Sequence, residues 1–343
     1  PKVGGFTATA DKYSVAMDIT HVEAQSILHD MVKTVDVVIE NYKVGSLAKY
    51  GLDYATLSAI NPKLVYCSIT GFGQDGPRAD EPGYDFIIQG ISGLMSITGE
   101  PDGVGAGAQK VGVAVVDIQT GLYATIAIQA ALLARHHTGN GQYIDISLLD
   151  VQIAGLANQG MNYLTSGKPP KRMGNKHPNI VPYQTFKAKD KEFIIACGND
   201  KQFADLCHAI GYDALLAEPQ FLKNQDRVKN RDELIALLSQ HFLTQTAEYW
   251  VAAIQAVKVP VGVINSIEDA LHEPQVLHRN MVVNITHTLN PDFTMIGSPI
   301  KLSDTPVQYK SAPPQLGEHT QTVLSQFVTP EQLNALTQRN ILG

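Results

Sequence analysis

Short apolar runs alternate with amphipathic stretches along the first half of the chain. The runs at 13–19, 35–39 and 64–69 predict strands. Apolar residues spaced three or four positions apart predict helices at 21–33 and 54–60. Strands and helices that alternate at this spacing favour βαβ units with a parallel sheet. The first half of the chain is therefore predicted to be α/β.

Two long helical patterns, at 118–137 and 148–163, follow in the middle of the chain. The glycines of Thr138-Gly-Asn-Gly-Gln142 are typical of a helix C-terminus, and a strand is predicted at 143–147. The most apolar segment, 122–134, has about 13 residues, which is too short to span a bilayer. We therefore expect a soluble protein with no membrane segment.

The chain changes character after residue 166. Proline, glycine and charged residues are concentrated in 167–178, which indicates a linker or a mobile loop and a domain boundary. Beyond this segment the pattern predicts a smaller α+β domain. Its expected elements are a hairpin at 186–197 and helices at 201–210, 232–243 and 246–256.

Composition narrows the class of protein. The chain of 343 residues is long enough for two domains and carries a net charge of -7 with no basic stripe, so we expect no nucleic acid partner. Cys67, Cys197 and Cys207 lie far apart and predict neither a disulfide framework nor a metal site, which suits a reducing compartment. The chain opens without an initiator Met or a leader-like segment, so we expect it to start inside a domain.

One acid, Asp117, follows the apolar residues 111–116 and precedes a long helix, with no basic residue close to it in the sequence. Aspartate is a preferred N-cap, so capping is the more frequent role of an acid in this place. A carboxylate at a helix N-terminus is also held ionised and aimed outward, where it could attack an activated carbonyl group. The sequence alone leaves both interpretations open.

Two other segments could belong to the same site. The tripeptide Gly-Tyr-Asp at 83–85 follows a glycine-rich turn at 71–77, where such residues are more often structural. Segment 40–45 follows a predicted parallel strand, and open α/β sheets bind ligands at the carboxyl ends of their strands. Lys43 and Lys49 could face a phosphate group there, or could lie on a solvated loop.

The common cofactor motifs do not occur in the sequence. There is no P-loop, no nucleophile elbow and no HExxH zinc motif. The glycines at 103–107 do not lie between a strand and a helix, as a dinucleotide-binding loop requires. We therefore expect no metal and no permanently bound cofactor.

Taken together, these segments resemble the class III coenzyme A transferases, the family of formyl-CoA transferase and α-methylacyl-CoA racemase. The resemblance runs along essentially the whole chain, and 175–186 and 198–203 are most similar to the succinate–hydroxymethylglutarate CoA-transferase branch. The segments that carry it are Asp36–Tyr42, Tyr66–Pro77, Gly83–Asp85, Ser92–Met95, Asp117–Tyr123, Thr138–Gln142 and Leu316–Thr320.

The resemblance implies an enzyme that moves CoA from an acyl-CoA, such as succinyl-CoA, to a small carboxylic acid, expected to be a dicarboxylic acid. The family's catalytic aspartate falls on Asp117, which implies an aspartyl anhydride followed by an aspartyl-CoA thioester. Because one thioester replaces another, the reaction needs neither ATP nor a metal, and the CoA thioester is a substrate. The anhydride must be kept from water, so we expect Asp117 to be closed off from solvent among the neighbouring valines.

The other site residues follow from the same resemblance. A distal carboxylate needs a cationic partner, and segment 167–178 offers candidates that could equally be a solvated linker. These candidates are Lys171, Arg172 and His177. CoA contacts match Met17, Thr20, Asn41, Tyr42, Lys49 and Tyr50, with Tyr84 and Asp85 lining the thioester pocket. Gly198, Asn199 and Asp200 fall near the loop that covers the site in formyl-CoA transferase, although its run of glycines is missing here.

The implied fold is a Rossmann-like large domain with a parallel sheet, a small domain, and an interlocked homodimer. The expected division is a large CoA-binding domain at 1–166, a linker at 167–185, a small domain at 186–285 and a return to the large domain at 286–343. Family members begin with a strand and a helix that this sequence lacks. We expect a cytoplasmic enzyme, or a mitochondrial matrix enzyme in a eukaryote.

Two other functions are compatible with these residues. An α-methylacyl-CoA racemase needs an acid/base pair at the α-carbon, and the racemases have a histidine where this sequence has Tyr84. A phenol is a poor general base near neutral pH, which favours CoA transfer. The third possibility is a CoA-binding protein without catalytic activity.

Overall fold

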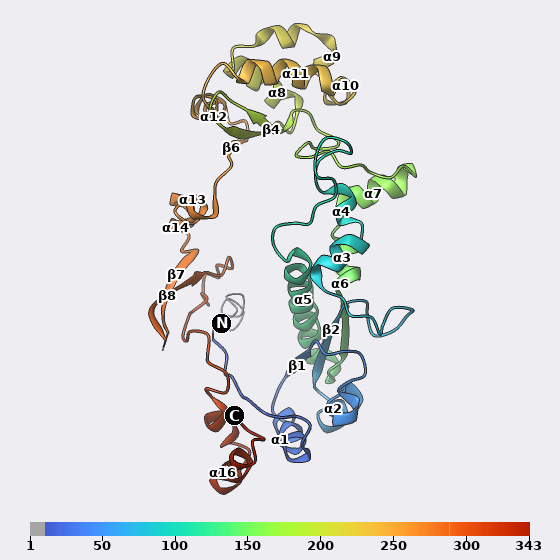
Figure 1. Cartoon of the computed structure of the whole chain (residues 1–343), viewed down its shortest axis with the longest axis vertical. Helices are drawn as coiled ribbons and strands as arrows, with labels where there is room; N and C mark the ends of the chain where they lie inside the picture. The colour runs from blue at the N-terminus through green and yellow to red at the C-terminus, as the bar shows by residue number, and fades with distance from the viewer. Residues whose placement is uncertain (1–10, 288) are drawn as a thin grey trace. The chain divides into compact units, whose positions relative to one another are not determined.

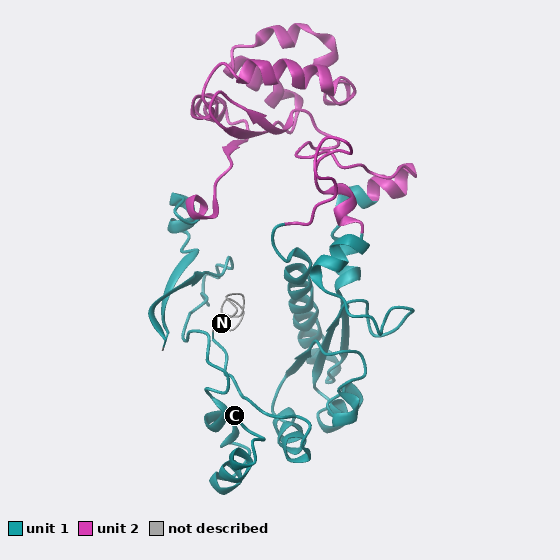
Figure 2. Cartoon of the chain, viewed as in Figure 1, with its two compact units in different colours: residues 1–92, 112–160, 271–343 teal, residues 93–111, 161–270 magenta. Residues whose placement is uncertain are grey.

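The computed structural model describes residues 11–287 and 289–343. They form two compact units, each assembled from separate stretches of the chain (Figure 2). The first unit contains the described residues up to 92 together with 112–160 and 271–343, and the second contains 93–111 and 161–270. These ranges differ from the division expected from the sequence, because 93–111 and 161–166 belong to the second unit and 271–285 to the first.

The first unit is built on a parallel sheet with the strand order β1-β2-β3. Strand β1 (Val37–Glu40) pairs with β2 (Val65–Thr70), which pairs on its other edge with β3 (Tyr143–Ser147). The central strand β2 begins with four buried residues, as the continuous apolar pattern of a parallel strand predicts. The predicted α/β architecture with a parallel sheet is confirmed, and the carboxyl ends of the three strands meet at one edge of the sheet.

Helices connect these strands. Helix α2 (Tyr54–Ile60) follows β1 as predicted, and α3 (Asp85–Ile91) and α5 (Val115–Thr138) lie between β2 and β3 in the chain. The single helix predicted at 148–163 is wrong. It is two helices, α6 (Leu148–Ala154) and α7 (Ala157–Ser166), because the backbone turns at Ala157, whose φ is 47°. Other helical elements in this part of the chain are α1 (Val22–Val32), η2 (Ala48–Tyr50) and α4 (Leu94–Ile97).

Helix α5 has 24 residues and is long and apolar enough, by length and composition, to cross a membrane. The length argument made from segment 122–134 was wrong, because the helix continues through polar residues on both sides of that segment. In the structure α5 packs against β2, β3 and α6 (Figure 1). Another side of α5 is apolar and exposed, with Ile118 at 55%, Leu122 at 59% and Ile126 at 61% exposure. The absence of a membrane partner stays a prediction.

The strand predicted at 13–19 is wrong. The segment forms one isolated antiparallel bridge, between Met17 and Leu342. The backbone N–H of Ser14 donates to Nδ1 of His319, 305 residues along the chain, at 3.2 Å. Partners this distant in sequence are invisible to a local pattern. The C-terminal elements are α14 (Pro274–His278), β7 (Val282–His287), β8 (Asn290–Ile296), α15 (Thr320–Leu324) and α16 (Pro330–Gln338).

The second unit has an antiparallel sheet of β4 (Tyr183–Lys187), β5 (Glu192–Ala196) and β6 (Val261–Val263). Its core contains edge-to-face contacts of the Phe242 ring with the rings of Phe186 and Trp250, an arrangement that aromatic quadrupoles favour. The predicted hairpin and the three predicted helices are confirmed to within a few residues. The helices after β5 are α8 (Asp200–Ala209), η3 (Asp213–Ala217), α9 (Pro219–Leu222), α10 (Asn224–Lys229), α11 (Arg231–Phe242), α12 (Ala247–Ala256) and α13 (Ile267–Leu271).

Candidate active site

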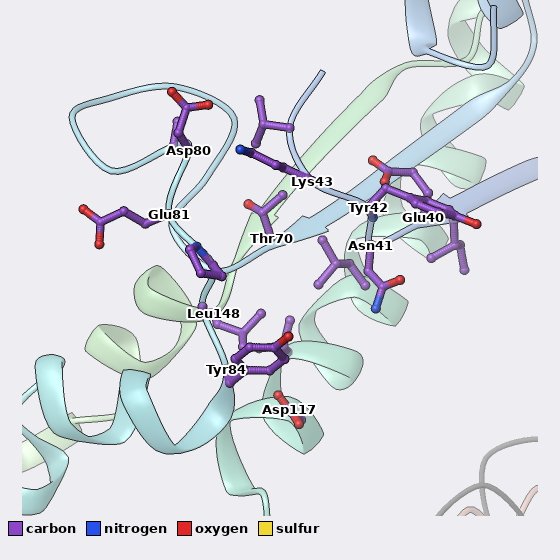
Figure 3. A pocket seen from close by; sticks show the side chains of 18 of the residues that line it. Glu40, Asn41, Tyr42, Lys43, Thr70, Asp80, Glu81, Tyr84, Asp117 and Leu148 are labelled. Atoms are coloured by element: carbon purple, nitrogen blue, oxygen red, sulfur yellow. Dashed lines mark hydrogen bonds between the residues drawn. The ribbon is translucent and has the colours of Figure 1, made fainter. Parts of the chain in front are cut away.

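A pocket of about 870 Å³ opens at the carboxyl ends of β1 and β2, within the first unit (Figure 3). This is the edge at which open parallel sheets bind ligands, and the sequence placed segment 40–45 there for the same reason. Four of the predicted site residues line the pocket, namely Asn41, Tyr42, Tyr84 and Asp117. Lys43, the other cation considered for this edge, also lines it. Lining residues that sequence reasoning missed include Thr70, Asp80, Glu81, Thr120 and Leu148.

Two glycines bring Tyr84 to the end of strand β2. Gly71 directly follows β2, and Gly83 directly precedes Tyr84. A Cβ atom added at Gly83 would lie 2.4 Å from the Cα of Gly71, and one added at Gly71 would lie 2.5 Å from the Cα of Gly83. The two backbones therefore approach more closely than any other residue allows. The tripeptide at 83–85 was not informative by itself in the sequence. The close approach of the two glycines places its first two residues in the pocket wall.

Asp117 is the third residue of helix α5, not its cap. The N-cap position is occupied by Ala114, which makes no side-chain hydrogen bond to the helix. The first-turn N–H groups instead find Asp85, whose Oδ2 accepts from the N–H of Val116 at 2.8 Å and from that of Asp117 at 3.4 Å. The capping interpretation of Asp117 is therefore wrong. Among the described residues, its carboxylate makes no hydrogen bond and no ion pair, and it lies beside the ring of Tyr84 in Figure 3.

The surroundings of Asp117 differ from the expectation in two ways. The side chain is exposed in this single chain, whereas the sequence suggested a carboxylate closed off among valines. Val116 is fully buried, but Val113 is 58% exposed, so the valines do not close over the acid. Partial burial and the nearby charge of Asp85 raise the pKa of Asp117. The helix N-terminus was expected to favour the ionised form, and these two effects oppose it.

The end of strand β1 is held by Glu40. Its Oε1 accepts a hydrogen bond from the hydroxyl of Ser68 on β2, and its Oε2 accepts from the backbone N–H of Tyr42 at 2.8 Å. These contacts fix the turn that carries Asn41 and Tyr42, and Figure 3 shows the Asn41 carboxamide directed from this turn into the pocket. Among the described residues of the lining, Lys43 is the cation, and Glu40, Asp80, Glu81 and Asp117 are the acids.

Five other predicted CoA contacts do not line the pocket. Met17 packs in the cluster formed by α1 and the C-terminal helices, and the hydroxyl of Thr20 donates to Asp18 at 2.7 Å. The Lys49 ammonium lies 4.7 Å from the ring centroid of Tyr50 in η2. Asp85 faces the first turn of α5 rather than the pocket. The structure does not bring these residues to the pocket, and their contacts with CoA stay predictions.

The residues predicted to hold a distal carboxylate lie in the second unit, and most are already engaged there. Lys171 is exposed. Arg172 forms an ion pair with Asp102 and donates from Nε to the carbonyl oxygen of Glu100 at 3.1 Å. Partial burial and the charge of Arg231 lower the pKa of His177, which favours its neutral form. A cationic His177 near neutral pH, as the sequence suggested, is therefore not supported.

Segment 198–200 begins helix α8 of the second unit. Asn199 caps this helix, because its side chain accepts from the N–H of Gln202 at 2.9 Å, and Gly198 donates its N–H to Gln202. Asp200 accepts from the buried guanidinium of Arg227 at 2.9 Å and from the N–H of Asn224 at 2.9 Å. These contacts belong to the architecture of the unit, and a substrate contact of segment 198–200 stays a prediction.

The model of CoA-transferase family III matches residues 6–320. The chain belongs to this family. Among its relatives, the succinate–glutarate CoA-transferase of Agrobacterium fabrum is 47% identical over 94% of this chain and 80% of its own length. The succinyl-CoA:glutarate CoA-transferase of Mus musculus is 39% identical over 93% of this chain and 72% of its own length. The crystal structure of a CAIB/BAIF family protein from Brucella suis matches with a TM-score of 0.81, at 45% identity over 94% of this chain and 83% of that chain.

Membership of CoA-transferase family III confirms the resemblance seen in the sequence. The chain is a class III CoA-transferase and therefore an enzyme, so the interpretation as a non-catalytic CoA-binding protein is set aside. Enzymes of this class use CoA thioesters as substrates. The matched residues include the whole described pocket, from Ile39 to Leu148.

Proposed function

We propose that this class III CoA-transferase moves CoA from succinyl-CoA to a small dicarboxylic acid, with Asp117 as the nucleophile. The relatives named for succinate and glutarate support the substrate class. The observation that carries the role of Asp117 is its unpaired carboxylate in a pocket at the carboxyl ends of β1 and β2. Because Asp85 satisfies the helix N-terminus, the Asp117 side chain is available for chemistry.

The proposed reaction passes through two kinds of covalent intermediate at Asp117, an anhydride and a thioester. An oxygen of the carboxylate attacks the thioester carbon, the C–S bond breaks, and CoA leaves as a thiolate, which gives an aspartyl-acyl anhydride. The thiolate then attacks the aspartyl carbonyl carbon, so that the donor acid leaves as a carboxylate and Asp117 holds CoA as a thioester. The acceptor carboxylate repeats both steps in reverse and leaves as its CoA ester. Each step exchanges one anion for another, so no external acid, base or oxidant is needed.

The pocket wall offers groups for the thioester and for an anionic group of the substrate. Tyr84 lies beside Asp117, where the thioester would have to be placed, and Asn41 and Tyr42 offer polar groups at the end of β1. Lys43 supplies the positive charge that a phosphate or carboxylate in the pocket requires. The other charged residues in the described part of the lining are acidic, so we assign anion binding in this pocket to Lys43.

Trapping the intermediate tests the nucleophile. Hydroxylamine or borohydride added to enzyme and succinyl-CoA should modify Asp117 alone, as read by peptide mass spectrometry. Asp117→Asn should lower kcat roughly a thousandfold or more while CoA binding persists, because the amide is not a nucleophile. Asp150 is the matched control, since it is also the third residue of its helix, α6, and does not line the pocket. Normal turnover of Asp117→Asn, or trapping at another residue, would contradict the assignment.

The same experiments separate transfer from racemisation. Incubation with a chiral 2-methylacyl-CoA in deuterated water should leave the α-hydrogen in place, because Tyr84 stands where the racemases have a histidine. Incorporation of deuterium at the α-carbon would favour the racemase. Exchange of labelled succinate into succinyl-CoA would support transfer.

A second copy of the chain is the proposed cover for the exposed side of α5. Ile118, Leu122 and Ile126 recur every fourth residue and form an apolar stripe that begins next to Asp117. A partner seated there would also limit the access of water to Asp117, which the single chain leaves exposed. Light scattering should show a dimer, and Leu122→Asp should yield monomers with lower turnover. Leu222→Asp, on an exposed site of the second unit, serves as the control. A fully active wild-type monomer would refute the proposal.

A further inference from the structure

Helix α5 depends on another helix for the hydrogen bonds of its first turn. The first N–H groups of any α-helix lack partners within the helix, and Ala114 has no side-chain oxygen to offer. Asp85, the first residue of α3, supplies one carboxylate oxygen to both Val116 and Asp117. Val116 is fully buried, so its N–H group would otherwise be left without a partner away from water. The proposed nucleophile thus lies in a helical turn whose position is set from α3.

The Asp85 carboxylate is itself held from behind. Its second oxygen, Oδ1, accepts from Nε2 of Gln89 at 2.6 Å, one turn further along α3. Gln89 is fully buried, and α3 packs against both α5 and α6. A short acid anchored by a buried amide has little freedom to rotate. The chain Gln89–Asp85–Val116 therefore connects the core of α3 to the backbone of the residue before Asp117.

We propose that Asp85 is a positioning residue of the transfer reaction, which holds the first turn of α5 in register and places a fixed negative charge behind the nucleophile. This inference rests on the proposed role of Asp117. It replaces the contact with the thioester that the sequence suggested for Asp85, because the carboxylate faces α5 and does not line the pocket.

The fixed charge favours the covalent steps. In the free enzyme Asp85 and Asp117 are two neighbouring anions. When Asp117 attacks the thioester, its negative charge passes to the CoA thiolate, and both the anhydride and the aspartyl-CoA thioester are uncharged at Asp117. The repulsion between the two acids is therefore relieved in each intermediate and restored when the free carboxylate returns. Asp85 raises the reactivity of Asp117 without touching the substrate.

The other charged and titratable groups around Asp117 come from the pocket wall. Among the described residues they are Tyr84 before α3, Glu40, Tyr42 and Lys43 at the end of β1, and Asp80 and Glu81 in the loop after β2. Asp85 is the one whose charge raises the pKa of Asp117. Activity that needs ionised Asp117 is lost as pH falls through this raised pKa. Removing the charge of Asp85 should therefore move the acidic limb of the kcat/KM profile to lower pH.

Asp85→Asn is the decisive variant, because its amide oxygen can still accept from Val116 and Asp117 while the charge is gone. We expect kcat to fall roughly tenfold, the KM for succinyl-CoA to change by less than about twofold, and the acidic limb of the pH profile to move down. Asp85→Ala, which loses the hydrogen bonds as well, should lower kcat further. Thr246→Ala is the control, because it removes a side-chain helix cap in the second unit and should lower only the melting temperature.

The outcomes distinguish this inference from the proposed function. If Asp117→Asn is inactive while Asp85→Asn keeps the wild-type kcat and pH profile, Asp85 is only a structural cap and the positioning role is refuted. If Asp117→Asn is active, the nucleophile assignment itself fails. Should Asp85→Ala not fold, the isosteric asparagine variant and the fraction of Asp117 trapped by hydroxylamine still decide the question.

Discussion

Two carboxylates, Asp117 in the first unit and Asp200 in the second, each lie in the first turn of a helix. Both were predicted from the sequence as site residues. Asp117 has another acid, Asp85, beside it, and burial together with that charge raises its pKa. Burial also opposes ionisation of Asp200, but the hydrogen bond and charge of Arg227, together with the N–H of Asn224 and the charge of Lys223, outweigh it, and the pKa of Asp200 is lowered.

The difference supports the proposed role of Asp117 as a nucleophile and gives Asp200 a structural partner. When neighbouring groups destabilise a carboxylate anion, its conversion into an uncharged group is favoured. Covalent catalysis makes this conversion, because the anhydride and the thioester carry no charge on the acid. An acid paired with a cation gains by keeping its charge. Arg227 is fully buried and also donates to the carbonyl oxygens of Val181 at 2.7 Å and Phe221 at 2.8 Å. Asp200 therefore completes the coordination of a buried guanidinium that ties three segments of the second unit together.

Removing Arg227 should produce the largest change. Arg227→Ala leaves buried carbonyl groups without donors and Asp200 without its partner, so the second unit should lose about 3 kcal/mol or more of unfolding free energy. Urea denaturation followed by Trp250 fluorescence measures this loss, since Trp250 belongs to the core of that unit. Lys223→Ala is the control, because the Lys223 ammonium lies 3.6 Å from Asp200 on the surface and should contribute within about 1 kcal/mol. Equal effects of the two variants would contradict the structural role of Arg227.

Asp200→Asn should have a smaller effect that depends on pH. The pKa of Asp200 is lowered in the folded chain, so its stabilisation is present above the unfolded pKa of about 4 and is lost as pH falls through the folded pKa. Because the side chain is 39% exposed, solvent screens the pair, and we expect a loss within about 1 kcal/mol at pH 7. The difference in unfolding free energy between Asp200→Asn and the wild type should disappear at acidic pH. A change in kcat without a change in stability would instead support the predicted contact of Asp200 with the substrate.

The sequence pattern predicted correctly those helices and strands whose limits are set by residues close to them in the chain. The helix at 54–60 and the strand at 143–147 were predicted with the bounds that the structure shows, because apolar spacing and flanking glycines set them. The segment at 13–19 was wrong because its partners, such as Leu342 and His319, come from the other end of the chain.

In the candidate site, too, the features that depend on contacts between distant residues could not be predicted. The position of Asp117 at a pocket could be predicted from the strand pattern and the family resemblance. Its release from capping could not, because the cap is Asp85, 32 residues earlier in the sequence and adjacent only in the fold. The predicted closure by valines failed for a similar reason, since the apolar side of α5 has no cover within the described chain.

The contact of Gly71 with Gly83 separates the loop between them, which can vary, from strand β2 and helix α3, which hold the pocket in place. The loop between these glycines leaves and returns at almost one point, so its length and composition place little constraint on β2 or α3. Asp80 and Glu81 belong to this loop and to the pocket wall. Exchanging residues 74–81 for the corresponding loop of another family member should thus change which acids the enzyme accepts, while the proposed nucleophile Asp117 and its support by Asp85 stay in place.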